Sequence, residues 1–161
     1  MINFQSYFSV RQATYSDIEA IHAITREAFE KYAEMSPNSN PEALSETLKD
    51  IKNDIDTKTV LLAVRDNIPV GAVRVSMDKE TKKAYLSRFA VKLSAQNNGI
   101  GKSLMNLVDE IMKKNGMEEI FLHTDSTIAA LIRFYYGRGF HVESVENSRG
   151  YPRAKLVKKY N

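Results

Sequence analysis

The hydrophobic residues of this chain change their spacing repeatedly along its length, and this alternation limits the folds that it can form. A first β-rich run is followed by two segments with the 3.6-residue period of amphipathic helices, and shorter β-rich runs then alternate with two more helical segments. The predicted order is strand, two helices, three strands, helix, strand, helix, two strands. A central mixed sheet with helices on both faces is the natural way to bury so many apolar stripes. The sequence therefore predicts the α/β (α+β) class.

Local signals set the boundaries of these elements. Thr14 and Asp17 form a capping-box pattern that starts a helix, and the two prolines of MSPNSNP end it. Pro41 then lies in the first turn of a second predicted helix, residues 41–55. The remaining predicted elements are strands at residues 7–14, 59–64, 69–77, 83–91, 119–124, 141–147 and 152–160, a helix from residue 100 to 115, and a helix that Ser126 caps and that ends near residue 139.

The composition excludes several classes of protein. A chain of 161 residues fits a single domain, residues 1–161, and 43% hydrophobic with 27% charged residues is ordinary for a globular protein. No apolar run approaches the ~20 residues of a membrane helix, and the start lacks a signal-peptide pattern, so we expect a cytoplasmic protein without a membrane partner. The chain has no cysteine and its three histidines lie far apart, so we expect no metal. A net charge of +3 with scattered basic residues does not favour nucleic acid as a partner.

A loop with two glycines, QNNGIGKS, lies between the strand at residues 83–91 and the following helix. The mononucleotide motif GxxxxGK[ST] requires a glycine where Gln96 stands, and the dinucleotide motif GxGxxG requires one at Leu104. What remains is a turn that opens a helix, whose free backbone N–H groups and partial positive charge bind anions. A tight strand-to-helix turn without a ligand is the alternative.

Two short patterns give this loop a specific context. Residues 96–101 match [RQ]xxGx[GA], with Val91 at the apolar position five residues earlier, and Tyr135, Gly139 and Phe140 match Y-x-x-x-G-F. Together with the order of elements, these patterns resemble the GNAT acetyltransferase family, which moves an acetyl group from acetyl-coenzyme A to an amine. The resemblance spans about residues 62–140. It implies a mostly antiparallel, splayed sheet of about six to seven strands with about four helices.

The resemblance implies a binding site for acetyl-coenzyme A. Its diphosphate would lie against the backbone N–H groups at the helix start, and its pantetheine arm would pair with the strand at residues 83–91. Many family members have an asparagine where this chain has Ile128, so Thr127 is the nearest polar substitute. The cofactor-binding residues predicted in this way are Phe89, Ala90, Val91, Gln96, Asn97, Asn98, Gly99, Ile100, Gly101, Lys102, Ser103 and Thr127.

The resemblance also implies two catalytic groups. Tyr135 would protonate or hydrogen-bond the leaving thiolate, because phenol and thiol pKa values of about 10 and 8.5 are close. The alternative is a core role, since Tyr135 shares a helical stripe with Ile128, Leu131 and Ile132. An alkylamine must lose a proton before it attacks, and His123 is the candidate base because its intrinsic pKa is about 6.5. A packed or surface histidine is the alternative there.

Recognition of the acceptor falls on the first two helices and the SRGYPR segment, where no motif applies. Phe29, Glu30 and Glu34 are the predicted acceptor-binding residues, the two glutamates because they attract a cation. Polyamine, aminoglycoside, amino acid, peptide N-terminus and protein lysine all stay open as acceptors, as does a homodimer. A non-catalytic coenzyme A-binding sensor is the alternative function. Gln96 disfavours a magnesium-dependent phosphotransferase, and the lack of an RNP pattern disfavours an RNA-binding domain.

Overall fold

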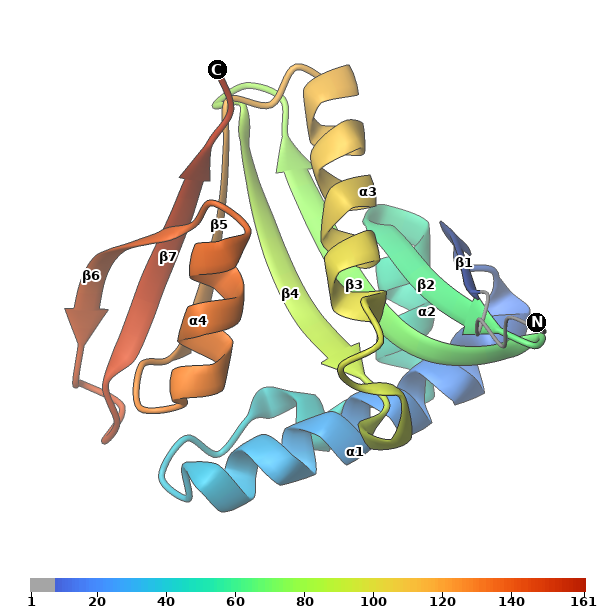
Figure 1. Cartoon of the computed structure of the whole chain (residues 1–161), viewed down its shortest axis with the longest axis horizontal. Coiled ribbons are helices and arrows are strands. Elements are labelled where there is room, and N and C mark those ends of the chain that lie inside the picture. The colour runs from blue at the N-terminus through green and yellow to red at the C-terminus, as the bar shows by residue number, and fades with distance from the viewer. Residues whose placement is uncertain (1–7) are drawn as a thin grey trace, which may run out of the picture.

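The computed structural model describes residues 8–161, so that Tyr7, the first residue of the first predicted strand, lies outside the described residues. The described chain forms seven strands in one sheet and four α-helices (Figure 1). Their bounds are β1 Phe8–Gln12, α1 Ile18–Met35, α2 Leu48–Thr57, β2 Thr59–Arg65, β3 Ile68–Asp78, β4 Lys83–Val91, α3 Ile100–Lys114, β5 Glu119–Asp125, α4 Ala129–Gly137, β6 His141–Glu146 and β7 Arg153–Lys159.

The sheet has the order β1-β2-β3-β4-β5-β7-β6, and every pair of neighbours is antiparallel except β4 and β5. These two parallel strands pair only from Lys83 to Tyr85 of β4, opposite Glu119 to Phe121 of β5. Beyond that point they diverge, and the sheet opens like a V (Figure 1). The mixed, mostly antiparallel and splayed sheet that the sequence and the resemblance predicted is therefore confirmed.

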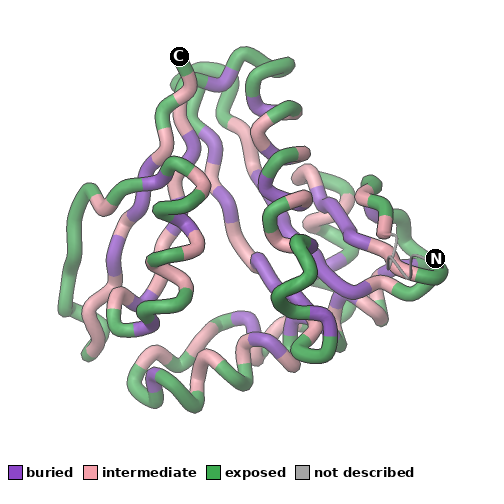
Figure 2. Tube along the Cα trace, in the orientation of Figure 1, coloured by how far each residue is buried: buried purple, intermediate pink, exposed green. Residues whose placement is uncertain are grey.

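Helices cover both faces of the sheet, as the alternating strands require. Leu61 and its neighbours on one face pack with Leu104 and Met105 of α3, whereas Leu62 on the other face packs with Ile21 of α1 and Ile51 of α2. Successive residues of a strand point to opposite faces, which is why adjacent leucines belong to different clusters. Figure 2 shows the resulting buried segments along the central strands.

The second helix differs from its prediction. The predicted continuous helix over residues 41–55 is two pieces, a 3-10 turn Glu42–Ser45 and α2, which starts only after Thr47. Thr47 is extended and forms a capping box: its hydroxyl accepts the N–H of Asp50 at 3.2 Å, and the Asp50 carboxylate accepts the N–H of Thr47 at 2.9 Å. The break turns Leu48 outward, with 46% of its surface exposed, although its spacing to Ile51 and Ile55 is that of one helical stripe.

The last helix also starts later than predicted. It begins at Ala129 rather than after Ser126, because the Asp125 carboxylate accepts both the N–H and the hydroxyl of Thr127 and holds these residues in a turn. The capping pattern before α1 behaves as expected, since the Asp17 carboxylate accepts the N–H of Thr14 at 2.8 Å. Between residues 8 and 161, no helix combines the length and the apolar character needed to cross a membrane.

Candidate active site

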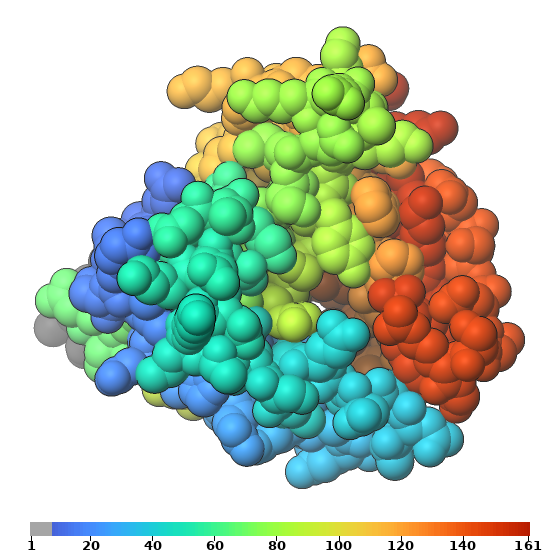
Figure 3. Space-filling model, turned by 180° about the vertical axis from the view of Figure 1, so that it is seen from behind, coloured from blue at the N-terminus to red at the C-terminus, as the bar shows by residue number. Residues whose placement is uncertain are grey.

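A cavity of about 690 Å³ opens where β4 and β5 separate. Its walls come from the end of α1, the segment at residues 38–43, β4, β5, α4 and the β6–β7 hairpin. Seen from behind in Figure 3, the surface is hollowed where the segment after α1, β4 and the hairpin meet. The cavity therefore exists because two parallel strands stop pairing, and six elements far apart in sequence line it.

A β-bulge in β4 shapes this opening. Ala90 pairs with Ala72 and Ser87 pairs with Arg74, so that Arg88 and Phe89 together lie opposite the single residue Val73. Arg88 has a positive φ of 53°, an unfavourable backbone for a residue with a side chain. Bulges bend a strand and redirect its side chains, and this one bends β4 at the point where it leaves β5.

Tyr135 is both a core residue and a lining residue of the cavity. Its ring packs against Phe134 and Phe140 at centroid distances of 5.3 and 5.5 Å, and only 4% of the residue is exposed, as expected for the core. The same residue lines the cavity, together with Ile128 and Leu131 of its helical stripe. Burial raises the pKa of the Tyr135 phenol above its ordinary value of 10.0. The phenol is thus protonated across the physiological pH range, and because a raised pKa makes it a weaker acid, it is better suited to donate a hydrogen bond than to transfer its proton.

His123 lines the same cavity, two residues beyond the last β4–β5 pair. Its Nδ1 lies 3.1 Å from the Tyr85 hydroxyl. Burial, together with the nearby charge of Arg153, holds the pKa of the imidazole below its ordinary value of 6.5. At neutral pH the ring is therefore uncharged, which is the state that can accept a proton.

Of the predicted cofactor-binding residues, those from 89 to 91 and from 96 to 103 lie at the carboxyl end of β4 and the start of α3 (Figure 1), whereas Thr127 lies apart from them, after β5. The first bond of α3 runs from the Ser103 N–H to the Gly99 carbonyl at 3.0 Å, so the N–H groups of residues 100–102 have no intrahelical acceptor. The Gln96 amide donates to the Val91 carbonyl at 3.3 Å and ties the loop to the strand. These free donors beside an open strand edge fit a diphosphate with an extended arm.

The two glycines of this loop are needed for different reasons. Gly99 has a φ of +77°, which disfavours other residues, but an added Cβ would meet nothing within 4 Å. At Gly101 the added Cβ would lie 2.9 Å from Cζ of Phe89 and 3.3 Å from Cε1 of Phe134. The close approach at Gly101 is therefore to aromatic rings of the protein itself, and these rings also contact Tyr135.

We expect Gly101→Ala to destabilise the protein by about 1–3 kcal/mol and to weaken acetyl-coenzyme A binding, because Phe89 must move away from the loop. Gly99→Ala is expected to cost about 1–2 kcal/mol through its left-handed backbone alone. Denaturant unfolding and calorimetry with acetyl-coenzyme A measure the two effects. A Gly101→Ala protein that binds as tightly as the wild type would show that the Phe89 position does not matter.

A buried polar cluster at the end of β5 had no sequence signal. The Asp125 carboxylate accepts the hydroxyl of Ser36, from the end of α1, and both donors of Thr127. Burial opposes ionisation of Asp125, but the hydrogen bonds from Ser36 and Thr127 outweigh it and hold its pKa below the ordinary value of 3.8. The hydroxyl of Thr127 is thus engaged within the protein, at 2.7 Å from Asp125.

The predicted acceptor-binding residues separate in the structure. Phe29 lines the cavity, whereas Glu30 and Glu34 are not among its lining residues. These two glutamates form exposed pairs along α1, with Arg26 at 3.0 Å and Lys31 at 3.6 Å. The charged residues that do line the cavity are Glu42, Arg88, Asp125, Arg149 and Arg153. Of these, Glu42 lies in the second predicted helix, and Arg149 and Arg153 lie in SRGYPR, the segments to which the sequence assigned the acceptor, but none was predicted individually.

A sequence model described as "Acetyltransferase (GNAT) family" matches residues 18–140. The chain belongs to this family. It is therefore an acyltransferase, and acetyl-coenzyme A is its acetyl donor.

Individual relatives agree with this assignment. Spermidine N(1)-acetyltransferase of Thermoplasma acidophilum is 28% identical over 152 residues, covering 86% of this chain and 91% of that protein. N-alpha-acetyltransferase 30 of Saccharomyces cerevisiae is 30% identical over 77 residues, covering 46% of this chain and 44% of that protein.

Solved structures share the fold. The PaiA N-acetyltransferase of Thermoplasma acidophilum, solved in complex with coenzyme A, has a TM-score of 0.81 at 23% identity and covers 96% of this chain and 99% of that one. The ribosomal-protein-S18-alanine N-acetyltransferase of Escherichia coli has a TM-score of 0.77 at 15% identity, with 95% and 94% covered.

Proposed function

We propose that this GNAT enzyme transfers the acetyl group to a primary amine by direct attack of the amine, through a tetrahedral intermediate. The observation that carries the proposal is the position of Tyr135: a buried, protonated phenol in the wall of a cavity whose lining includes Phe89, the ring that lies close to Gly101 at the start of α3. The relatives named above are N-acetyltransferases of spermidine, of ribosomal protein or of protein N-termini, and this supports an amine acceptor.

The donor would bind along the predicted residues at the end of β4. The backbone N–H groups of residues 99–102 would hold the diphosphate, and the edge of β4 that the splay leaves unpaired, near Phe89 and Val91, would hydrogen-bond the pantetheine arm. A main-chain N–H near Val91 would then stabilise the developing oxyanion. Bound in this way, acetyl-coenzyme A presents a thioester carbonyl to the amine.

Two side chains would move the protons. His123, uncharged at neutral pH, would accept the proton of the acceptor ammonium directly or through water, and Tyr85 would orient its ring. Tyr135 would donate a proton or a hydrogen bond to the sulfur as the thiolate leaves. The two groups reach the cavity from β5 and α4.

A thiol-release assay with acetyl-coenzyme A and a panel of amines tests the proposal. We expect release that depends on both the amine and Tyr135, with the acetylated amine identified by mass spectrometry. Binding of acetyl-coenzyme A without turnover on any amine would instead favour the alternative function, a non-catalytic sensor.

The pH dependence tests the role of His123. Because its pKa lies below 6.5, kcat/KM is expected to rise with pH through an acidic limb with a midpoint below 6.5 and then to level off as the imidazole becomes neutral. In His123→Ala that limb should vanish and kcat/KM should fall by about 10²-fold or more. An unchanged limb in His123→Ala would exclude the histidine as the base.

A further inference from the structure

Some of the charged side chains that line the cavity have partners within the protein, and others do not. Arg88 donates to Glu46 at 3.2 Å, and Asp125 accepts from Ser36 and Thr127. Among residues 8–161, however, Arg149 and Arg153 have no carboxylate within the 4.0 Å of an ion pair. Two unpaired guanidinium groups of the β6–β7 hairpin therefore face a cavity that must accept a small molecule or a chain end.

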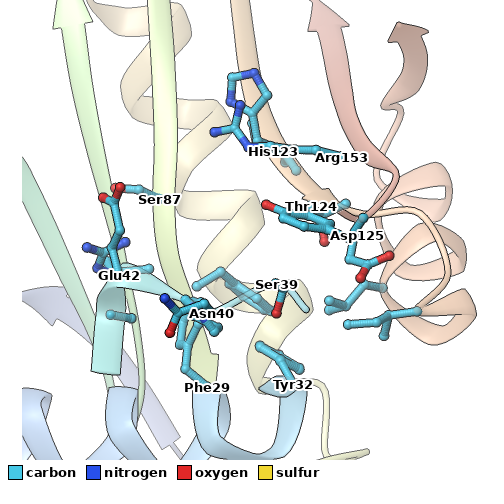
Figure 4. A pocket seen from close by; sticks show the side chains of 18 of the residues that line it. Phe29, Tyr32, Ser39, Asn40, Glu42, Ser87, His123, Thr124, Asp125 and Arg153 are labelled. Carbon is cyan, nitrogen blue, oxygen red and sulfur yellow. The ribbon is translucent and has the colours of Figure 1, made fainter. Parts of the chain in front are cut away.

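The position of Arg153 shows why its charge has no partner within the protein. It lies directly opposite Asp125 in the antiparallel pairing of β5 and β7, so both side chains are on the face that borders the cavity. Asp125 is nevertheless committed to Ser36 and Thr127, and the half-buried Arg153 side chain extends instead toward His123 (Figure 4). Partial burial of an unpaired cation is unfavourable, and an anionic ligand would relieve it.

We propose that the acceptor is a primary amine that also carries a carboxylate or phosphate group, and that Arg153, with Arg149, binds this group. This inference rests on the proposed function and narrows its acceptor class. Glu42 lies across the cavity, beside Ser87, where it can attract the ammonium form of the same molecule (Figure 4). A volume of about 690 Å³ suits a small ligand of this kind.

A polyamine acceptor fits these charges poorly, because its second ammonium would meet the two arginines. A neighbouring groove is lined by several carboxylates, which at first suggests a subsite for that ammonium. They are already engaged: Glu46 binds Arg74 and Arg88, and Asp54 also binds Arg74. Asp50 accepts the N–H of Thr47 in the α2 capping box. Glu42 also lines this groove, but it is the carboxylate assigned above to the first ammonium, so a second ammonium would meet only carboxylates that already have partners within the protein.

Thiol release with four acceptor series of matched chain length tests the inference: alkylamines, α,ω-diamines, ω-amino acids and aminoalkyl phosphates. We expect kcat/KM for the best anionic acceptor to exceed that for the matched diamine by about 10- to 100-fold. Arg153→Gln should remove this preference by raising KM for the anionic acceptor about 10- to 100-fold, with little change for the alkylamine when both enzymes are compared at a pH well above 6.5, where His123 is neutral with or without Arg153. A preference for phosphates over carboxylates would identify the anion.

Lys155→Gln is the matched control. Lys155 also lies near His123 and lowers its pKa, but it pairs with Glu143 and is not among the residues that line the cavity. The Lys155→Gln enzyme should therefore still prefer anionic acceptors over diamines. The inference would be overturned if diamines reacted as well as the anionic acceptors, or if the Arg153→Gln enzyme kept the preference for anionic acceptors. Neither result would contradict the proposed acetyl transfer to an amine. If no amine reacts, calorimetry on the coenzyme A-loaded protein decides: anionic amines must bind more tightly than diamines, and Arg153→Gln must abolish the difference.

Discussion

Replacing Tyr135 with phenylalanine is expected to lower kcat for acetyl transfer by about 10²- to 10⁴-fold, with nearly unchanged affinity for acetyl-coenzyme A. The substitution removes one hydroxyl and keeps the ring that packs against Phe134 and Phe140. Because burial keeps the phenol protonated, its loss removes a proton donor from the cavity and little else. Steady-state thiol release gives kcat, and calorimetry gives the affinity for the donor.

Tyr136→Phe provides the comparison. This neighbour is 52% exposed and is not among the residues that line the cavity, so the same chemical change there should leave kcat near the wild-type value. Thermal unfolding should show both variants folded with similar stability. Wild-type turnover by Tyr135→Phe would reduce this residue to its packing role and remove the main support for the proposed mechanism.

Much of the fold could be predicted because its signals are local. The β-rich run at residues 59–64 predicted β2, whose adjacent leucines pack on opposite faces, and the helical spacing of apolar residues in α1 predicted a helix that buries Ile21 and Ala28. The loop before α3 is local too, since Gly99 takes the left-handed backbone that a turn into a helix uses. The Y-x-x-x-G-F pattern is local as well, because it singled out Tyr135 from the spacing of three residues.

What escaped prediction depends on contacts between distant parts of the chain. Ser36 and Asp125 are 89 positions apart, and only the fold shows that a carboxylate at the end of β5 anchors the end of α1. The helical spacing of residues 41–55 is real, but the capping box at Thr47 divides it. For the same reason Glu30 and Glu34 were plausible acceptor residues by spacing along α1, although the cavity lies on another side of that helix.

The division of the second helix also places Glu46 between its two pieces, where it joins a buried ion network. Both Glu46 carboxylate oxygens accept from the Arg74 guanidinium, at 2.5 and 2.7 Å, and Asp54 binds the same guanidinium at 2.8 Å. Arg74 lies on β3 and is 0% exposed. Glu46 also binds Arg88, the residue with positive φ at the bulge of β4. One carboxylate therefore joins the segment after α1 to β3 and to β4, of which β4 lines the cavity.

Glu46→Ala is expected to lower the free energy of unfolding by about 3–5 kcal/mol, because the fully buried Arg74 loses two of its three hydrogen bonds to carboxylates and keeps only Asp54 as a partner. For a chain of 161 residues this corresponds to a fall in Tm of roughly 6–20 °C, which calorimetry can measure. Glu34→Ala is the control, since its pair with Lys31 is exposed and should contribute about 0–1 kcal/mol.

KM for the acceptor should also rise in Glu46→Ala, because Arg88 loses the partner that holds the bulge. Equal stability of the two variants would mean that Asp54 alone satisfies Arg74 and that the bulge needs no support from this network.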